Sequence, residues 1–279
     1  MDEDAPVSAE DGTTEMTPGA SRAASVARGP DVSGRVVVVT GASKGIGRRA
    51  AAHFLDRGDL VHGCARSPSP IEHPAYVHHR LDVADETAVK TMMSTIRRAH
   101  GRIDVLVNAA GEASMNHALL TPTETLEALL RTNVVGSFVC AREAARLMRP
   151  EARRRDRDTP ADGAPAGGRI VNLTSVAVPL KLAGAAAYAA AKAAVESLTQ
   201  TLARELAPMG ITVNAVGPGP VRTRMTRTVP PETIDRLLSA QTVSRLATTD
   251  EVVRVIDFLA DPAAAMVTGQ IIYLGGVSR

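Results

Sequence analysis

Aromatic side chains are scarce in this chain of 279 residues. Phe, Trp and Tyr together make up 2% of the sequence, and tryptophan is absent. The core must therefore be built from Ala, Val, Leu and Ile, and a hydrophobic content of 44% is enough for one large domain. Because only three tyrosines are present, each is a candidate for a specific role.

An excess of charge of one sign is also lacking. Lys and Arg number 32 against 30 Asp and Glu, which leaves a net charge of +2. This balance, together with the shortage of aromatic rings on which bases stack, argues against a nucleic-acid-binding protein.

Cysteines and long apolar runs are few. Cys64 and Cys140 stand in apolar surroundings, so no disulfide framework is indicated and a reducing compartment is expected. No apolar stretch approaches the roughly 20 residues that span a bilayer. Residues 1–33 contain no apolar segment of a secretory signal and are rich in Ala, Ser, Gly, Pro and acidic residues. We expect these residues to form a disordered extension of a cytoplasmic protein.

Strand-like and helix-like segments alternate over residues 34–279. Runs rich in Val, Ile and Leu predict strands at 35–40, 59–65, 75–83, 102–111, 169–175, 211–216 and 270–276. Helical patterns lie between them, including 86–101 and a long one at 124–148. The alternation predicts a single α/β domain with a Rossmann-type doubly wound parallel sheet flanked by helices.

Two segments interrupt this alternation. Residues 149–168 combine a run of charges with Pro, Gly and Ala, which predicts an exposed loop insertion. Residues 217–240 are punctuated by Pro and Gly directly after a strand. Because ligands of such folds bind beyond the carboxyl ends of the strands, this second segment is predicted to be a lid over the substrate.

A glycine turn follows the first predicted strand. Gly41, Gly45 and Gly47 allow a tight turn and a close approach of the backbone to a pyrophosphate at a helix N-terminus, although a plain connector is an equal interpretation of the turn alone. The second strand ends at Arg66, where an acidic residue would bind the ribose of NAD, and Lys44 lies within the turn. Two cations without a carboxylate favour the 2′-phosphate of NADP(H) over NAD(H), although Arg66 by itself is also compatible with an ordinary surface arginine.

Tyr188 and Lys192 stand four residues apart in an alanine-rich run, "AAAYAAAKAA", at 185–194. Alanine favours a helix, and this spacing places both side chains on one face about one turn apart. The pair alone is also compatible with an ordinary surface helix.

The chain resembles the short-chain dehydrogenase/reductase family from about Gly34 onward. The motifs that carry the resemblance, in order, are Thr40 to Gly47, Leu81-Asp82-Val83, Asn108-Ala109-Ala110-Gly111, Asn133, Ser175, Tyr188 with Lys192, and Pro218-Gly219 followed by Thr223. The segments "YAAAKAA", "RELAPMGITVNAVGPG" and "TGQIIYLGG" look most similar to 3-oxoacyl-[acyl-carrier-protein] reductases. The sequence departs from the family at "NAAG", where Asn-Asn-Ala-Gly is usual, and leaves almost no room for a helix between Ser67 and Tyr76.

The resemblance implies a catalytic set of Asn133, Ser175, Tyr188 and Lys192. Tyr188 would be the general acid or base, and Lys192 would lower the pKa of its phenol and hold the nicotinamide ribose. Ser175 would donate a hydrogen bond to the substrate carbonyl oxygen, and Asn133 would hold a water that connects Lys192 to solvent. The cofactor-binding residues implied are Gly41, Ser43, Lys44, Gly45, Ile46, Gly47, Arg66, Asp82, Val83, Asn108, Ala109, Gly111, Tyr188, Lys192, Pro218, Gly219, Val221 and Thr223.

The substrate walls expected by position are small and apolar. Besides Ser175 and Tyr188 they include Ala177, Val178 and Met225. They suit the reduction of a ketone to a secondary alcohol, on a small molecule or an acyl thioester carried by a carrier protein. Three arginines of the lid segment, Arg222, Arg224 and Arg227, would either bind a carboxylate or phosphate of the substrate at the mouth of the pocket or face solvent.

Alternative functions are an NAD(P)-dependent alcohol dehydrogenase that oxidises a small hydroxy substrate, and a sensor or scaffold that binds NADP(H) without chemistry. A homotetramer is expected by resemblance. The histidines of "HPAYVHH" have no carboxylate or cysteine partner at ligand spacing, so no metal site is predicted.

Overall fold

The computed structural model describes residues 34–148, 167–222 and 231–277. Contacts divide the chain into two units, Met1–Asp31 and Val32–Arg279, and the description below concerns the second. The predicted extension at 1–33, and the predicted loop at 149–168 apart from its last two residues, lie outside the described residues and stay predictions. Within the described ranges, no helix combines the length and the apolar character that a membrane crossing requires.

Seven parallel strands form one sheet in the order β3-β2-β1-β4-β5-β6-β7. Their bounds are Val36–Thr40 for β1, Leu60–Ala65 for β2, Tyr76–Arg80 for β3, Val105–Asn108 for β4, Arg169–Leu173 for β5, Thr212–Gly217 for β6 and Ile271–Tyr273 for β7. The chain crosses over between β3 and β4, which is the topological switch of a doubly wound fold. The predicted fold class is therefore confirmed.

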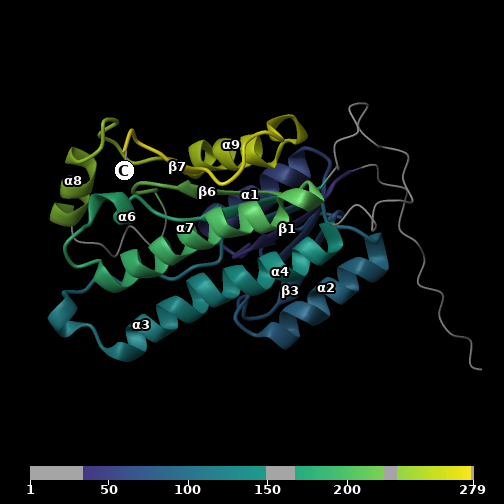
Figure 1. Cartoon of the computed structure of the whole chain (residues 1–279), viewed down its shortest axis with the longest axis horizontal. Coiled ribbons are helices and arrows are strands. Elements are labelled where there is room, and N and C mark those ends of the chain that lie inside the picture. Colours follow the sequence, from purple (N-terminus) through teal and green to yellow (C-terminus); the bar gives the residue numbers. More distant parts are fainter. Residues whose placement is uncertain (1–33, 149–166, 223–230, 278–279) are drawn as a thin grey trace, which may run out of the picture. The chain divides into compact units, whose positions relative to one another are not determined.

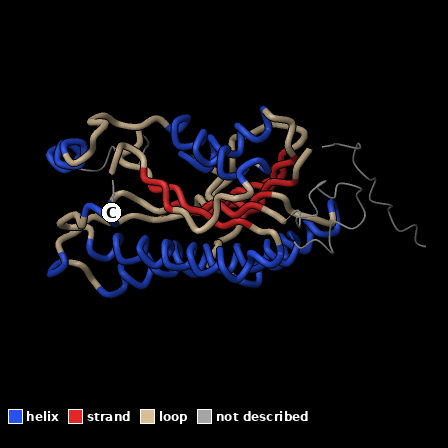
Figure 2. The backbone as a smooth tube through the Cα atoms, turned by 45° about the horizontal axis from the view of Figure 1, so that its top comes forward, coloured by secondary structure: helices blue, strands red, loops and turns tan. Residues whose placement is uncertain are grey.

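Helices cover both faces of this sheet (Figures 1 and 2). One face carries α2 (Glu86–His100), α4 (Gly136–Met148) and α7 (Ala186–Leu206), and the other carries α1 (Gly45–Asp56) and α9 (Thr249–Ala260). The remaining α-helices of the described residues are α3 (Thr123–Leu130), α6 (Ala177–Leu180) and α8 (Pro231–Ser239). Short 3₁₀ turns lie at Ala118–Leu120, Ala207–Met209 and Pro262–Ala264.

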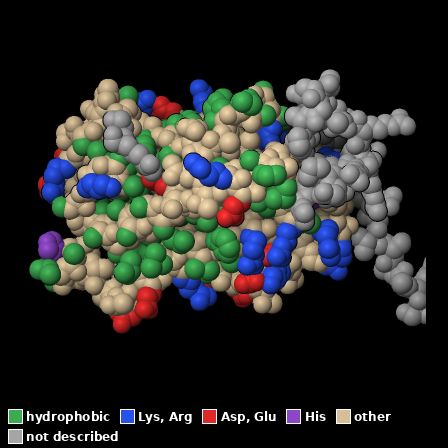
Figure 3. Space-filling model, in the orientation of Figure 1, with side chains coloured by type: hydrophobic (Ala, Val, Ile, Leu, Met, Phe, Trp, Pro, Cys, Tyr) green, Lys and Arg blue, Asp and Glu red, His purple; other side chains and the backbone are tan. Residues whose placement is uncertain are grey.

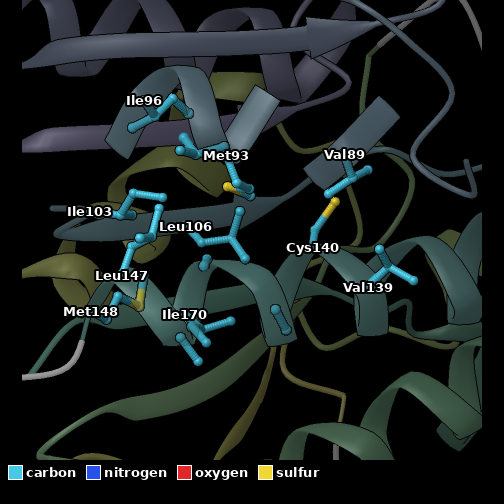
Figure 4. Packing of buried hydrophobic residues seen from close by; sticks show 14 of the residues in the cluster. Val89, Met93, Ile96, Ile103, Leu106, Val139, Cys140, Leu147, Met148 and Ile170 are labelled. Atoms are coloured by element: carbon cyan, nitrogen blue, oxygen red, sulfur yellow. The ribbon is translucent and has the colours of Figure 1, made fainter. Parts of the chain in front are cut away.

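The β-branched run of β1 explains both halves of the core. All five residues of β1 are buried, and successive side chains of a strand point to opposite faces. Val36 and Val38 pack with α2 and α4, whereas Val37 and Val39 pack with α1 and α9. Figure 4 shows part of the first cluster, in which Met93 points toward Leu106, and Ile96 and Met148 belong to the same cluster. Aliphatic side chains thus replace the missing aromatic ones.

The chain between β2 and β3 contains no helix, as the short interval in the sequence predicts. Tyr76 packs directly over Gly63 of the neighbouring strand, and a Cβ at position 63 would lie 2.2 Å from the Tyr76 hydroxyl. The Tyr76 hydroxyl also lies 2.8 Å from Nδ1 of His78. A side chain at position 63 would therefore displace the Tyr76 ring.

Two local features differ from the predictions. The long helix expected at 124–148 is interrupted at Arg131–Val135 by a π-helical turn between α3 and α4. The segment after Ser175, predicted only as a wall of the substrate site, forms the short helix α6. Helix periodicity does not reveal a π turn, because one inserted residue leaves the apolar pattern on either side intact.

Three histidines meet at one edge of the sheet. Nδ1 of His62 lies 3.0 Å from Nε2 of His79, and Nε2 of His62 lies 3.0 Å from Nε2 of His100. Burial, followed by the neighbouring His79 and His100, lowers the pKa of His62 from 6.5 to about 3. No group of metal-binding residues was found among the described parts of the chain.

His62 should make the protein sensitive to acid. Its folded-state pKa is depressed, so the unfolded chain binds the proton first and stability falls as the pH drops from 6.5 towards 3. This dependence amounts to at most about 1.4 kcal/mol per pH unit. We expect the loss of melting temperature between pH 7 and pH 5 to be smaller in His62→Leu than in the wild type. The exposed His73→Leu is the control, and an equal effect of both substitutions would contradict the assignment.

Candidate functional site

The turn between β1 and α1 is shaped to receive a phosphate group. Gly41 has a φ of +70°, and a Cβ there would lie 2.9 Å from the carbonyl oxygen of Ala109 at the end of β4. A Cβ on Gly47 would lie 2.5 Å from the carbonyl oxygen of Gly41. Gly45, at a φ of +56°, faces open space instead. The backbone is thus compact behind the turn and accessible in front of it.

The N-terminus of α1 contributes to this fit. The helix begins at Gly45, and the side chain of the preceding Lys44 does not cap it. Exposed N–H groups at a helix N-terminus, together with the helix dipole, bind anions. Lys44 itself is exposed, whereas Ser43 and Ile46 are half-buried beside it. These residues fit the pyrophosphate of a dinucleotide.

A chain of polar side chains lies beneath the site. Asn108 donates through Nδ2 to Oδ1 of Asn172 at 2.9 Å, and Asn172 donates to the hydroxyl of Thr199 at 2.9 Å. Thr199 in turn donates to the carbonyl of Val195 at 2.7 Å. All three side chains are buried, so the chain of hydrogen bonds ties β4, β5 and α7 together.

Asn133 lies inside the π turn and is fully buried. Its Nδ2 donates to the carbonyl of Leu129 at 2.9 Å and to that of Glu112 at 3.0 Å. Its Oδ1 accepts no hydrogen bond from the described residues. A Cβ on Gly111 would lie 2.7 Å from this Oδ1 and 3.3 Å from Nζ of Lys192. Asn133 and Lys192 therefore flank the same glycine, with an acceptor directed into the site.

Ser175, Tyr188 and Lys192 come together at the carboxyl end of β5. Ser175 follows β5 by two residues, and its hydroxyl accepts from the backbone N–H of Ala177 at 3.2 Å. Tyr188 lies in the first turn of α7, and Nζ of Lys192 lies 6.0 Å from the centre of its ring. Lys192 is buried and donates to the carbonyl of Leu173 at 2.8 Å.

The ionisation of the pair differs in one respect from the expectation. Burial lowers the pKa of Lys192 to about 8. Burial also raises the pKa of the Tyr188 phenol, and its hydrogen bond with Ser175 only partly opposes this rise. The expected lowering of the Tyr188 pKa is therefore not found in the protein alone, because the loss of solvation outweighs the neighbouring hydroxyl.

A buried carboxylate that the sequence analysis missed supports the same site. Glu196, one turn after Lys192, is 1% exposed. Its Oε1 accepts from the hydroxyl of Thr174 at 2.7 Å and from that of Tyr273 at 2.6 Å. Thr174 directly precedes Ser175, so Glu196 connects α7 and β7 to the segment that bears the serine. The spacing of four that links Tyr188, Lys192 and Glu196 is a signal from which this residue was detectable.

A second carboxylate that the sequence analysis missed, that of Glu112, pairs with Arg66. Nη2 of Arg66 forms an ion pair of 2.6 Å with Oε1 of Glu112, directly after Gly111. The expectation of two cations without a carboxylate is thus incomplete. No sequence signal reveals this contact, because Arg66 and Glu112 are 46 residues apart and meet only through the order of the strands.

The other predicted residues are distributed as follows. Val83 is buried, and Asp82 accepts from the backbone N–H of Ala84 at 3.0 Å beyond β3. Pro218 and Gly219 follow β6, and Val221 forms an isolated bridge with Ala247. Ala177 and Val178 are buried in α6. Thr223 and Met225 lie outside the described residues, as does the central part of the predicted lid.

Replacement of Glu196 should destabilise the protein. Glu196→Leu would remove the carboxylate that accepts from the hydroxyls of Thr174 and Tyr273, and a hydrogen bond to a charged group contributes about 1.5–3 kcal/mol. We expect a clear fall in melting temperature, measured by calorimetry. Glu205→Leu, at an exposed position of the same helix, is the matched control and should have little effect. Equal melting temperatures for both variants would refute a structural role of the Glu196 carboxylate.

Together, the parallel sheet, the glycine turn and the Ser, Tyr and Lys side chains define a Rossmann-type oxidoreductase that uses a nicotinamide cofactor. Residues 41–277 match the family model described as enoyl-(acyl carrier protein) reductase, and the chain belongs to the short-chain dehydrogenase/reductase family.

Named relatives agree with this assignment. The 3-oxoacyl-[acyl-carrier-protein] reductase of Vibrio cholerae is 32% identical over 252 residues, which cover 88% of this chain and 98% of the relative. The chloroplastic NADPH-dependent aldehyde reductase 2 of Arabidopsis thaliana is 31% identical over 270 residues. The matched region covers 88% of this chain and 94% of the relative. Different carbonyl-reducing activities are therefore found at similar sequence distance.

Solved structures show the same likeness. ElxO with NADP bound superposes with a TM-score of 0.75 at 28% identity, covering 86% of this chain and 97% of that one. The ligand-free aldohexose dehydrogenase of Thermoplasma acidophilum gives a TM-score of 0.74 at 29% identity, covering 89% and 98%.

Proposed function

We propose that this protein is an NADP(H)-dependent ketoreductase that reduces a 3-oxoacyl thioester or a related ketone to a secondary alcohol. The observation that carries the proposal is the grouping of Ser175, Tyr188 and Lys192 at the carboxyl end of β5, beside the glycine turn that fits a dinucleotide. When bound, the nicotinamide would supply the hydride.

The side chains divide the remaining chemistry between them. The Ser175 hydroxyl donates to the substrate oxygen, on which negative charge develops. The Tyr188 phenol, kept protonated by its burial, gives its proton to that oxygen. Lys192 and a water held by Oδ1 of Asn133 then return a proton to Tyr188. A burial-lowered pKa of about 8 makes the Lys192 ammonium able to release a proton near neutral pH.

The preference for NADP(H) rests on Arg66 and Lys44. Arg66 is a cation at the end of β2, where the adenosine ribose of a dinucleotide lies in such folds, and Lys44 is an exposed cation in the glycine turn. The NADP in the ElxO structure and the cofactor in the name of the Arabidopsis relative point in the same direction.

The substrate class rests on the reductases of carrier-protein-bound substrates among the relatives. Ala177 and Val178 would form a small apolar wall of the substrate site. The exposed Arg222 belongs to the predicted lid. A small hydroxy substrate oxidised in the reverse direction is the second candidate, because an aldohexose dehydrogenase has a similar structure.

Tyr188→Phe tests the catalytic proposal. The variant keeps the ring but lacks the hydroxyl that donates the proton. We therefore expect the rate of ketone-dependent NADPH oxidation, followed by the absorbance of the nicotinamide, to fall about 100-fold or more. Tyr76→Phe, which removes a phenol at the far edge of the sheet, should retain activity. Full activity of Tyr188→Phe would exclude Tyr188 as the acid, and a chain without activity on any carbonyl would favour the sensor interpretation.

We also propose a homotetramer. Figure 3 shows hydrophobic side chains spread over the face that α3, α4 and α7 present. On α4 and the π turn before it, Phe138 and Val135 are 40% and 46% exposed. Exposed apolar surface of this kind is typical of interfaces between subunits.

Light scattering tests the assembly. We expect the mass of the wild type at micromolar concentration to correspond to four chains. Phe138→Glu would place a charge in the proposed interface and should reduce the mass. Phe258→Glu, at a position 51% exposed on α9, is the matched control. A monomeric wild type would refute the proposal.

A further inference from the structure

The ion pair between Arg66 and Glu112 joins the segments that follow two strands beside the proposed cofactor site. Arg66 directly follows β2, and Glu112 follows β4 by four residues. Their side chains meet at 2.6 Å between Nη2 and Oε1. In the sheet, β1 lies between β2 and β4, so the pair extends across the carboxyl end of β1.

The pair therefore crosses the part of the groove in which the adenosine half of a dinucleotide would lie. The glycine turn after β1 packs against the backbone of Ala109 and Ala110. Glu112 comes directly after Gly111, where a Cβ would meet Oδ1 of Asn133 at 2.7 Å and Nζ of Lys192 at 3.3 Å. A dinucleotide that extends from the end of β2, over the glycine turn, towards Lys192 would therefore meet this ion pair.

We infer that the Arg66–Glu112 ion pair is a clasp over the cofactor groove that opens when a dinucleotide binds, and that Glu112 is a specificity-determining residue. The inference rests on the proposed nicotinamide-dependent function. On opening, the 2′-phosphate of NADP(H) replaces the Glu112 carboxylate as the partner of Arg66. The 2′-hydroxyl of NAD(H) carries no charge, so Arg66 loses its ion pair without a replacement.

The exposure of the two side chains sets the size of the effect. Arg66 is 65% exposed and Glu112 is 35% exposed, so water screens the pair. Ion pairs of this kind change an equilibrium by about twofold to fivefold. The backbone carbonyl of Glu112 accepts from Asn133, but this contact does not involve the Glu112 side chain and remains after its substitution.

Calorimetric titration of the full chain with NADPH and with NADH, at fixed salt, tests the clasp. Glu112→Gln weakens the pair while keeping the shape of the side chain. It should tighten the binding of both dinucleotides by about twofold to fivefold. Arg66→Gln also opens the clasp but removes the phosphate ligand. It should tighten NADH by a similar factor and weaken NADPH by about tenfold or more.

The double variant separates the clasp from a general effect of charge. Once Arg66 is replaced, Glu112 has no partner in the clasp, so Glu112→Gln in the Arg66→Gln background should leave the affinity for NADH unchanged. Glu124→Gln, which removes the same charge from the exposed first turn of α3, is the control and should alter neither affinity. Melting temperatures of all variants report whether the fold is retained.

The outcomes distinguish the clasp from the proposed cofactor preference. An affinity for NADH that is the same in the wild type, Glu112→Gln and Arg66→Gln would overturn the clasp, even if NADPH is preferred. A wild type that prefers NADH, with NADPH binding insensitive to Arg66→Gln, would overturn the NADP(H) preference, whereas tighter NADH binding in both variants would still support the clasp. If the wild type binds neither dinucleotide, both proposals are wrong.

Discussion

The hydrogen bond from Lys192 to the carbonyl of Leu173 is the contact on which the geometry of the site depends. It joins α7 to the last residue of β5 at 2.8 Å in a buried setting, so that the helix and the strand end cannot shift independently. Tyr188 lies one turn before Lys192 on the helix, and Ser175 lies two residues beyond Leu173. This contact thus helps to fix the position of the Tyr188 phenol relative to the Ser175 hydroxyl.

Buried polar groups around this contact hold it in place. Thr174 and Glu196 link the strand end to the next turn of α7, and Asn172 and Thr199 link the strand to the helix one level below. Each of these groups has a partner, because an unpaired polar group in a dry interior is costly. Oδ1 of Asn133 is a buried acceptor without a partner among the described residues, and it lies beside Gly111 at the proposed site. Oδ1 of Asn108, in the polar chain that ties β4 to β5, is likewise a buried acceptor without a partner among the described residues.

The two ends of the proposed cofactor site differ in how deeply their charged side chains are buried. At the catalytic end, burial controls ionisation: it lowers the pKa of Lys192 to about 8 and keeps the Tyr188 phenol protonated. At the proposed adenosine end, the side chains of Arg66 and Glu112 are 65% and 35% exposed, so water screens their ion pair. An ion pair of this kind exchanges partners more easily than the buried contacts of Lys192, as the proposed clasp requires.

The alternation of strands and helices follows from the local sequence, because runs such as "VVVVT" and glycine turns carry their own conformational preference. The same holds for the pairing of Tyr188 with Lys192, since a helix brings residues four apart onto one face. Three other features arise only in the folded chain: Glu112 reaches Arg66, Asn133 lies in a π turn, and burial raises the pKa of Tyr188. These three depend on the order of the strands, on a local defect in a helix and on the exclusion of water, and none of them leaves a periodic pattern in the sequence.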